Sequence, residues 1–321
     1  MGGYFGPGIA MGGQKRLPKF RRVPESLSSK RITERSIAII ETIGRYRFIT
    51  TKDILRLVGG NEDVTHRHLQ RLYHRDLVSR FILPTAKSGE FIYFLDNAVA
   101  LRELAASTKL NAAVLDWEQI KQNRAKYAPD KSGNGRSVGQ FLFIQHELMI
   151  SGFRADLELA CRKQGRVQIE RWMQGAPLWN KVQARSGRTL PHRPDAFFTL
   201  YFPNAAEGQQ RANFFYEADR ATSNIKKIRQ SFEAHLRFIL TGKYTQEYGV
   251  KKIRAVLVET VSAGRARQMK RIASELAAHE PLAGMLFWFT NTERREAGKL
   301  PTTLSSIWEV AADERMRSLL D

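Results

Sequence analysis

The chain has 321 residues and carries 52 Lys and Arg against 32 Asp and Glu, a formal net charge of +20 at pH 7. An excess of this size predicts a polyanionic partner, most often nucleic acid. No apolar run reaches the roughly 18 residues of a spanning helix, which argues against membrane insertion. The single cysteine, Cys161, excludes an internal disulfide framework and a cysteine-based zinc finger, and this composition predicts a cytoplasmic location.

Residues 1–29 combine six glycines before Gln14 with a basic cluster that follows it. This composition predicts a disordered basic arm. Two interpretations of the arm remain open. It is either a solubilising tail or a segment that lies along DNA phosphates and adds affinity without specificity.

Residues 30–110 show the order of a winged helix-turn-helix. A first helix begins after Thr33, a second is capped by Thr50 or Thr51, and a third occupies "NEDVTHRHLQRLYHRDLVSR". Two strands around the turn "TAKSGE" follow, and the third helix is the one expected to enter the major groove. The candidate DNA contacts are polar residues of this helix and one lysine of the turn: His66, Arg67, His68, Gln70, Arg71, Arg75 and Lys87.

Residues 111–137 are expected to form a linker, because the stretch is charged and "KYAPDKSGNGRS" is rich in Gly, Pro and Ser. Over residues 138–321 the pattern predicts a long helix, three strands, a helix, a strand, a helix and a strand. We expect a last helix in the tail, Leu304–Leu319. The runs "AVLVE" and "MLFWF" are typical of strands buried on both faces of a sheet. This order predicts an α/β domain with helices on both sides of a central mixed sheet.

Acidic residues mark two neighbouring predicted strands in "RPDAFFTLYFPNAAEGQQRANFFYEADR". Asp195 stands near the start of the first strand and Glu217 at the end of the second, so in a meander both lie at one end of the sheet. Two such carboxylates are hard oxygen ligands for Mg²⁺ or Mn²⁺, which activate an attacking water. Strand alternation places Asp219 on the face of Glu217 and Tyr216 on the opposite face. The alternative is that these acids pair with the many arginines.

"RPD" followed by "FFYEAD" on this frame resembles the PD-(D/E)XK, or restriction-endonuclease-like, nuclease fold, over about residues 138–295. The resemblance implies that Asp195 and Glu217 are metal ligands and that Glu147, on the first helix, is a further acid of the site. His146 beside it is interpreted as a surface or partly buried side chain. The nuclease pattern has Lys two residues after the second acid, where this chain has Asp219.

Asp219 is therefore interpreted either as a third metal ligand or as a charge partner for a nearby cation. Lys226 and Lys227, on the following helix, are the candidate replacements for the motif lysine. The other interpretation of these two lysines is a solvated basic face.

The winged helix, the "HEL" helix and "RPDA…FFYEADRATSNIKKIRQSFEAHLRFI" together resemble the replication-relaxation family of bacterial plasmids and integrative elements, over about residues 30–295. The resemblance implies a metal-dependent DNA endonuclease or relaxase that nicks double-stranded DNA at an origin of transfer or replication, together with other DNA-processing proteins of the element. The alternative is a nuclease-fold protein without catalysis that binds DNA as a replication accessory or transcriptional regulator.

Overall fold

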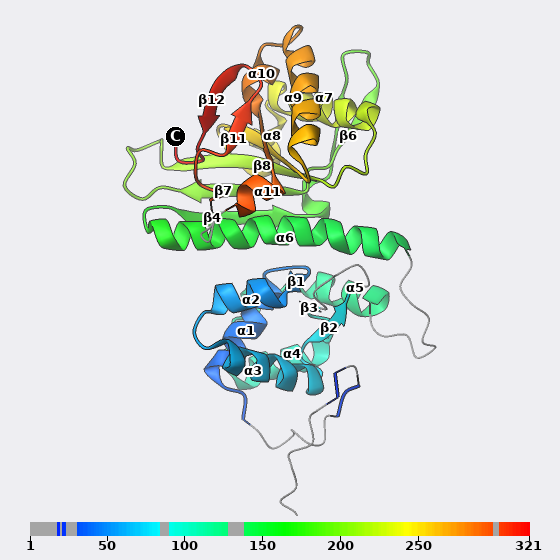
Figure 1. Ribbon diagram of the computed structural model, residues 1–321, viewed down its shortest axis with the longest axis vertical. Helices are drawn as coiled ribbons and strands as arrows, with labels where there is room; N and C mark the ends of the chain where they lie inside the picture. The colour runs from blue at the N-terminus through cyan, green and yellow to red at the C-terminus, as the bar shows by residue number, and fades with distance from the viewer. Residues whose placement is uncertain (1–17, 20, 24–30, 84–89, 128–137, 298–301) are drawn as a thin grey trace, which may run out of the picture. The chain divides into compact units, whose positions relative to one another are not determined.

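The computed structural model describes residues 18–19, 21–23, 31–83, 90–127, 138–297 and 302–321. The chain divides into two compact units, residues 1–135 and residues 136–321 (Figure 1). Within the described ranges, no helix has both the length and the apolar character needed to cross a membrane.

The first unit has the predicted winged helix-turn-helix order. Side-chain caps from Thr33, Thr50 and Asn61 begin its first three helices, and Gly59 ends the second at a φ of 67° that favours glycine. A small antiparallel sheet of order β1-β3-β2 completes it. Its elements are α1 (Glu34–Gly44), β1 (Ile49–Thr50), α2 (Thr51–Val58), α3 (Glu62–His74), β2 (Ser79–Ile82) and β3 (Phe91–Phe94).

Part of the expected linker is folded onto this first unit. After α4 (Ala98–Ser107) and a short 3₁₀ turn (Ala112–Val114), helix α5 spans Trp117–Tyr127. Ile120, Asn123 and Tyr127 recur at helical spacing and are buried. The ring of Tyr127 meets the ring of Phe48 edge-on at 5.1 Å. The prediction of a linker over residues 111–137 is therefore wrong for α5, because its many charges obscure the buried stripe; residues 128–137 lie outside the described ranges.

The expectation of disorder over residues 1–29 does not hold for Arg22. Its guanidinium donates to the carbonyl of Tyr73 at 3.0 Å and to that of Val78 at 3.1 Å, and it forms an ion pair with Asp76 at 2.6 Å. Arg22 thus binds to the end of α3 and the start of β2. Most other residues of the predicted arm lie outside the described ranges.

The second unit contains the predicted mixed sheet, in the order β12-β11-β10-β9-β8-β7-β4. Strands β8, β9 and β10 are parallel, and their neighbours on both sides are antiparallel. The carboxyl ends of the three parallel strands consequently meet at one edge. The strands are β4 (Gln168–Gln174), β7 (Ala196–Tyr201), β8 (Arg211–Asp219), β9 (Ala255–Thr260), β10 (Phe287–Asn291), β11 (Trp308–Val310) and β12 (Asp313–Arg317).

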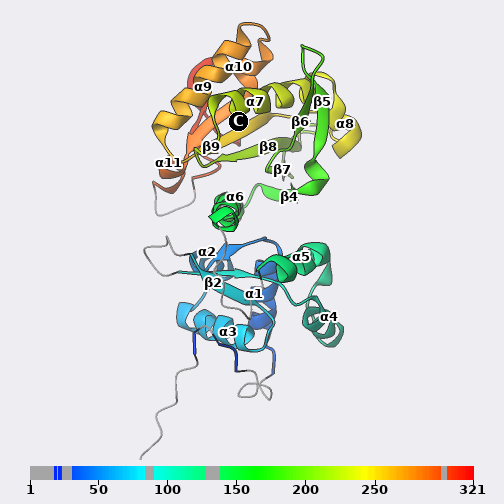
Figure 2. The ribbon, with the colours of Figure 1, turned by 90° about the vertical axis from the view of Figure 1, so that its right-hand side faces the viewer.

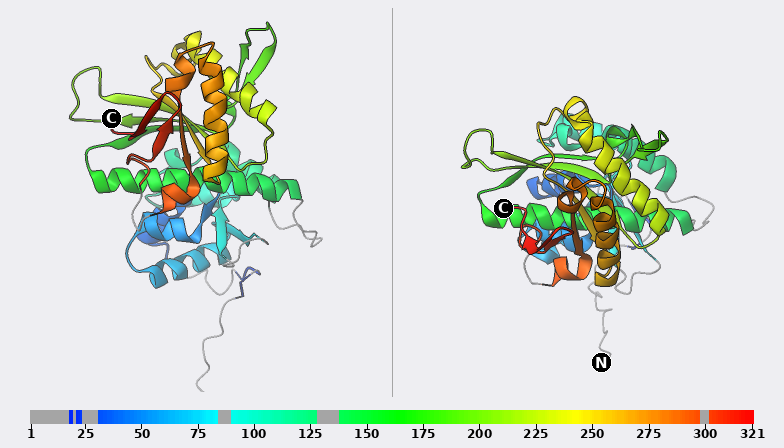
Figure 3. Two further views of the ribbon diagram at one scale, coloured as in Figure 1. Left: turned by 45° about the horizontal axis from the view of Figure 1, so that its top comes forward. Right: turned by 90° about the horizontal axis from the view of Figure 1, so that it is seen from above.

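Helices cover both faces of this sheet, as predicted (Figures 2 and 3). The long helix α6 packs Phe153 and Leu157 against one face, on which Phe198, Phe214 and Trp308 also lie. Helices α7 and α9 pack against the other face in a second apolar cluster. The helices of this unit are α6 (Val138–Gln164), α7 (Ile225–Leu240), α8 (Lys243–Tyr248), α9 (Ala263–Ala277), α10 (Leu282–Leu286) and α11 (Thr292–Glu296).

Two features of the second unit differ from the structure that the sequence predicts. A separate hairpin of β5 (Asn180–Gln183) and β6 (Thr189–His192) is inserted between β4 and β7 after a 3₁₀ turn, Ala176–Leu178. The expected tail helix is instead the strand pair β11 and β12, with Trp308 and Val310 buried on alternate positions. The spacing of the apolar residues at 304, 307 and 308 mimics a helical stripe, which explains the wrong prediction.

Candidate active site at the edge of the central sheet

Asp195 and the acids of β8 meet at the edge where the parallel strands end. Asp195 directly precedes β7, whose first residue, Ala196, is paired with Tyr216 of β8. One oxygen of Asp195, Oδ2, accepts a hydrogen bond from the backbone N–H of Ala218 at 2.8 Å. That N–H lies between Glu217 and Asp219 in the chain. The fold therefore brings the two acids of the "RPD" and "YEAD" segments together, although they are 22 residues apart.

Neighbouring residues of β8 face opposite sides of the sheet, as alternation predicts. The hydroxyl of Tyr216 donates to Glu259 at 2.9 Å, and its ring stacks on Phe153 of α6 at 4.0 Å. The carboxylate of Glu217 lies on the other side, where it meets His235 of α7. Tyr216 is therefore a fully buried packing residue and is directed away from Glu217.

Each of the two acids, Asp195 and Glu217, has an imidazole as its side-chain partner. Nε2 of His146, on α6, lies 2.9 Å from Oδ1 of Asp195. Nε2 of His235 lies 2.7 Å from Oε1 of Glu217, and Nδ1 of the same ring lies 3.0 Å from Nε2 of His192. The side chains of Asp195 and Glu217 remain 20% and 19% exposed, so both are reachable from solvent.

The electrostatics of this group favour an added cation. Burial and the nearby charge of Asp195 raise the pKa of Glu217 well above its usual value. Burial lowers the pKa of His235 to about 3, so this ring is neutral at physiological pH and does not offset the carboxylate charge. For His146 burial acts to lower the pKa, but Asp195, Glu147 and Glu217 outweigh it and the pKa is raised.

Asp219, unlike Asp195 and Glu217, has an arginine as its partner. Nε of Arg265, on α9, donates to Oδ2 of Asp219 at 2.8 Å, and the hydroxyl of Thr260 donates to the same oxygen at 3.0 Å. Only 9% of the Asp219 side chain is exposed. The position at which the nuclease pattern has lysine is thus occupied by a carboxylate in a partly buried ion pair.

The remaining candidates of this site have different surroundings. Glu147 is buried next to His146 on α6, and its Oε2 accepts from Nε2 of Gln174 at 2.9 Å. Lys226 and Lys227 are exposed in the first turn of α7 and form no side-chain hydrogen bond or ion pair with the acids within the described ranges. Glu147 therefore lies close enough to His146 to act on its pKa, whereas neither lysine is brought into contact with the acids within the described ranges.

The carboxylate oxygens of Asp195 and Glu217 suit a divalent cation that takes only some of its ligands from the protein. No group of three or more His, Cys, Asp or Glu side chains within the described ranges forms a metal-binding cluster. Mg²⁺, however, is commonly bound through one or two carboxylates plus waters and substrate phosphates. Oε2 of Glu217 takes no hydrogen bond from the described part of the chain. Asp195 and Glu217 therefore supply hard oxygen donors of the type such a cation takes.

The candidate DNA-contacting residues of α3 differ in how exposed they are to solvent. His66 and Arg67 are exposed, whereas His68, Gln70, Arg71 and Arg75 are half-buried. Nδ1 of His68 lies 2.8 Å from the hydroxyl oxygen of Ser36 on α1; burial, together with the charges of neighbouring arginines, lowers the pKa of His68. Its ring thus joins α3 to α1. Lys87 lies outside the described ranges.

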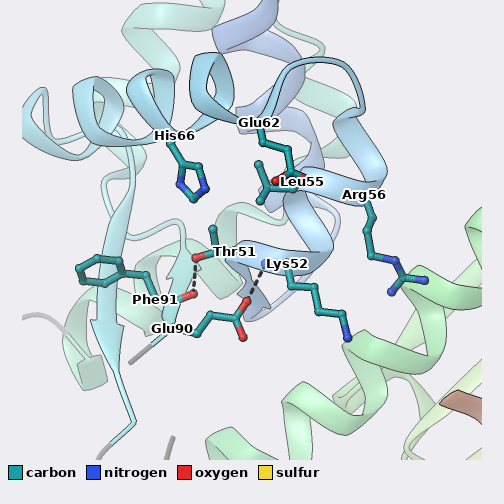
Figure 4. A pocket seen from close by; sticks show the side chains of 8 residues that line it. All are labelled: Thr51, Lys52, Leu55, Arg56, Glu62, His66, Glu90 and Phe91. Atoms are coloured by element: carbon teal, nitrogen blue, oxygen red, sulfur yellow. Dashed lines mark hydrogen bonds between the residues drawn. The ribbon is translucent and has the colours of Figure 1, made fainter. Parts of the chain in front are cut away.

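His66 also lines a hollow of about 510 Å³ on the first unit. Figure 4 shows the side chains around it, which come from α2, from α3 and from the start of β3 with the residue before it; His66 is directed into the space between them. Lys52 and Arg56 line it together with Glu62 and Glu90, and Oε1 of Glu90 accepts from the backbone N–H of Lys52 at 2.6 Å. The hollow therefore has charges of both signs on its wall.

Sequence reasoning missed three side chains around the acids. His192 and His235 received no role, and His146 was not assigned to Asp195. One signal was present: His235 falls on the buried stripe of α7 with Ile228 and Phe232, where a polar side chain requires a partner. No local pattern connects these histidines to acids that are 18 to 49 residues away.

Comparison with known proteins gives one family. The model of a family described as replication-relaxation matches residues 40–253, about two thirds of the chain. No curated protein and no solved structure matches the chain.

Proposed function

The chain belongs to the replication-relaxation family, and from this premise we propose that it nicks one DNA strand at an origin of a plasmid or integrative element. The observation that carries the proposal is that Asp195 and Glu217 lie at one sheet edge, where Asp195 accepts from the N–H of Ala218, the residue after Glu217. In open α/β sheets, ligands bind outside the carboxyl ends of the parallel strands, which is where these acids stand.

Asp195 and Glu217 would bind Mg²⁺ or Mn²⁺, because their oxygens are hard donors and their neighbours leave the group short of positive charge. When bound, such an ion polarises a phosphodiester and lowers the pKa of a coordinated water. The chain itself contributes the hydrogen bond from β8 that fixes Asp195, and the imidazoles beside both acids. Glu147, held by Gln174, adds negative charge close to His146.

Duplex DNA is the partner that the first unit fits. Its third helix presents Arg67 and His66 to solvent, and the net charge of the whole chain favours a polyanion. Arg67→Ala should weaken binding in a fluorescence anisotropy titration. If Arg67 contacts phosphate, the slope of log affinity against log salt decreases by about 1, and if it reads a base edge, sequence preference is relaxed.

The test of catalysis is a nicking assay on supercoiled plasmid that carries the element's origin, with and without Mg²⁺ or Mn²⁺. Wild-type protein is expected to convert the plasmid to open circles only with metal, and Asp195→Asn or Glu217→Gln to abolish the conversion. Glu170→Gln is the matched control, since Glu170 is a solvent-accessible acid that pairs with Arg211 at the sheet surface. Equal nicking by wild type and Glu217→Gln would falsify the site.

A second function, DNA binding without cleavage, is favoured by one specific observation. The motif lysine is replaced by Asp219, which Arg265 already holds, and Lys226 and Lys227 stay exposed. A replication accessory or transcriptional regulator would protect a specific site in a footprint and produce no nicks with any divalent metal. Its Asp195→Asn variant would bind DNA as wild type does, and metal-dependent nicks would remove this alternative.

A further inference from the structure

Behind Glu217 lies a pair of buried imidazoles, His235 and His192, each with 1% of its surface exposed. His235 is the only one of the two that touches the acid, through Nε2 and Oε1 at 2.7 Å. Its other ring nitrogen lies 3.0 Å from Nε2 of His192. The two rings thus form a hydrogen-bonded chain that ends on one oxygen of Glu217.

Packing fixes the outer ring of this chain. His192 ends β6, on the hairpin outside the central sheet. Its ring stacks on Phe238 with 4.1 Å between centroids and 13° between planes, and it meets Phe215 edge-on at 5.3 Å. Because aromatic rings pack against it on two sides, the ring of His192 has little freedom to rotate. Its hydrogen bond to His235 in turn limits the rotation of the His235 ring.

The hydrogen bonds of the pair have a preferred direction. Nδ1 of His192 is buried and has no hydrogen-bond partner among the residues that the structure describes. A proton on that nitrogen would leave a buried donor unsatisfied, which is costly, so the proton belongs on Nε2. His192 then donates to Nδ1 of His235, and Nε2–H of His235 donates to Oε1 of Glu217. The chain therefore fixes one oxygen of Glu217 as an acceptor and leaves Oε2 available.

We propose that His192 and His235 are positioning residues that hold Glu217 in the orientation in which its second oxygen binds a divalent cation. The inference rests on the proposed function, because it takes Glu217 to be a ligand. Partners behind a metal ligand commonly change metal affinity by about 10- to 100-fold. The proposal also gives the inserted hairpin a role, since the segment "HRPD" supplies both the outer support, His192, and the acid Asp195.

The test measures Mn²⁺ binding to the full chain by electron paramagnetic resonance, without DNA. His192→Phe keeps a ring to stack on Phe238 but cannot donate to His235, and we expect its Kd for Mn²⁺ to rise about 10-fold. His192→Gln restores a donor and should recover most of the wild-type affinity. Glu217→Gln removes the ligand itself and should weaken binding more than either.

The outcomes separate the inference from the proposed function. Wild-type affinity in His192→Phe, with weakened binding in Glu217→Gln, overturns the positioning role and leaves the site intact. Unchanged affinity in Glu217→Gln removes the site and the inference with it.

A measurement on the wild-type chain does not depend on the folding of a variant. Nitrogen-15 spectra of histidine-labelled protein should show His192 protonated on Nε2 and bare at Nδ1. Protonation of His192 on Nδ1 contradicts the proposed direction and overturns the inference.

Discussion

Two sets of acids near the same edge of the central sheet differ in their cationic partners. The arginine-paired acids are Asp156 and Glu259, which share Arg295, and Asp219, which pairs with Arg265. The imidazole-paired acids are Asp195 with His146 and Glu217 with His235. Arginine keeps its charge at every physiological pH, whereas an imidazole is charged only when protonated.

This difference determines whether an acid has a permanent positive charge beside it. Arg295 and Glu259 are almost fully buried, and the surrounding acids raise the pKa of Arg295 against the effect of its burial. Asp156 and Glu259 therefore share a permanent positive charge that is buried beside them. The charge of Glu217 is not neutralised by His235, because that ring is neutral. One strand, β8, therefore carries one acid of each kind two residues apart.

The largest expected effect is on the arginine-paired set. Arg295→Met removes the guanidinium that pairs with the buried acids Asp156 and Glu259 and should lower the free energy of unfolding by about 3–5 kcal/mol. Urea denaturation followed by circular dichroism measures this loss. Arg211→Met, at the exposed pair with Glu170, is the control and should change stability little. A similarly small loss of stability in Arg295→Met would contradict a structural role for the arginine-paired acids.

The next effect concerns pH. Burial lowers the pKa of His192 from 6.5 to about 2, so the unfolded chain takes up a proton as the pH falls through 6.5 and the folded chain does not. The wild type should therefore lose about 2 kcal/mol of stability between pH 7 and pH 5 through this ring alone. His192→Phe has no such proton to bind, and its loss over this range should be smaller by that amount. Parallel stability curves for the two proteins would contradict the prediction.

A smaller effect contrasts the two acids of β8 directly. Without divalent metal at pH 7, Glu217→Gln should raise the free energy of unfolding by about 1 kcal/mol, because the raised pKa means that the ionised form is disfavoured in the fold. Asp219→Asn is the matched control and should lower stability, since it removes the charge partner of Arg265. If the free energy of unfolding changes in the same direction in both variants, the difference between an imidazole and an arginine partner does not distinguish the two acids.

The smallest effect tests the backbone just beyond these acids. Ala221 has a φ of 58°, in the left-handed region that costs a non-glycine residue about 1–2 kcal/mol. Ala221→Gly should therefore raise stability by about 0.5–1 kcal/mol once the greater freedom of glycine in the unfolded chain is subtracted. Differential scanning calorimetry should show a higher Tm, and a lower Tm would mean that the turn after β8 is not strained.

Much of the fold follows from local pattern. The sequence predicts the helix caps at Thr33 and Thr50 and the apolar strands β9 and β10, because these features depend only on residues that are neighbours in the chain. The tail was misread because Leu304, Ile307 and Trp308 have helical spacing although they lie on strand and turn segments. Helix α5 was missed because its charged exposed face dominates its composition.

Of the candidate site, the sequence predicts only that its acids lie together. Asp195 and Glu217 belong to short motifs and lie at strand ends, so pattern and topology suffice to bring them together. The partner of each acid depends on how α6, α7 and α9 pack against the sheet, which no local signal encodes. Arg265 and His235 therefore remained unassigned, and with them the distinction between Asp219 and Glu217.

The packing of helix α5 also determines which truncated fragments of the first unit keep its core intact. A fragment that ends at Leu110 removes Tyr127 from the ring of Phe48 and leaves the carbonyl of Leu95 without the hydrogen bond from Asn123. That fragment would expose an apolar surface of the first unit and should aggregate. A truncation after Tyr127 retains both contacts. It is the fragment of the first unit with which the proposed DNA binding can be tested without the second unit.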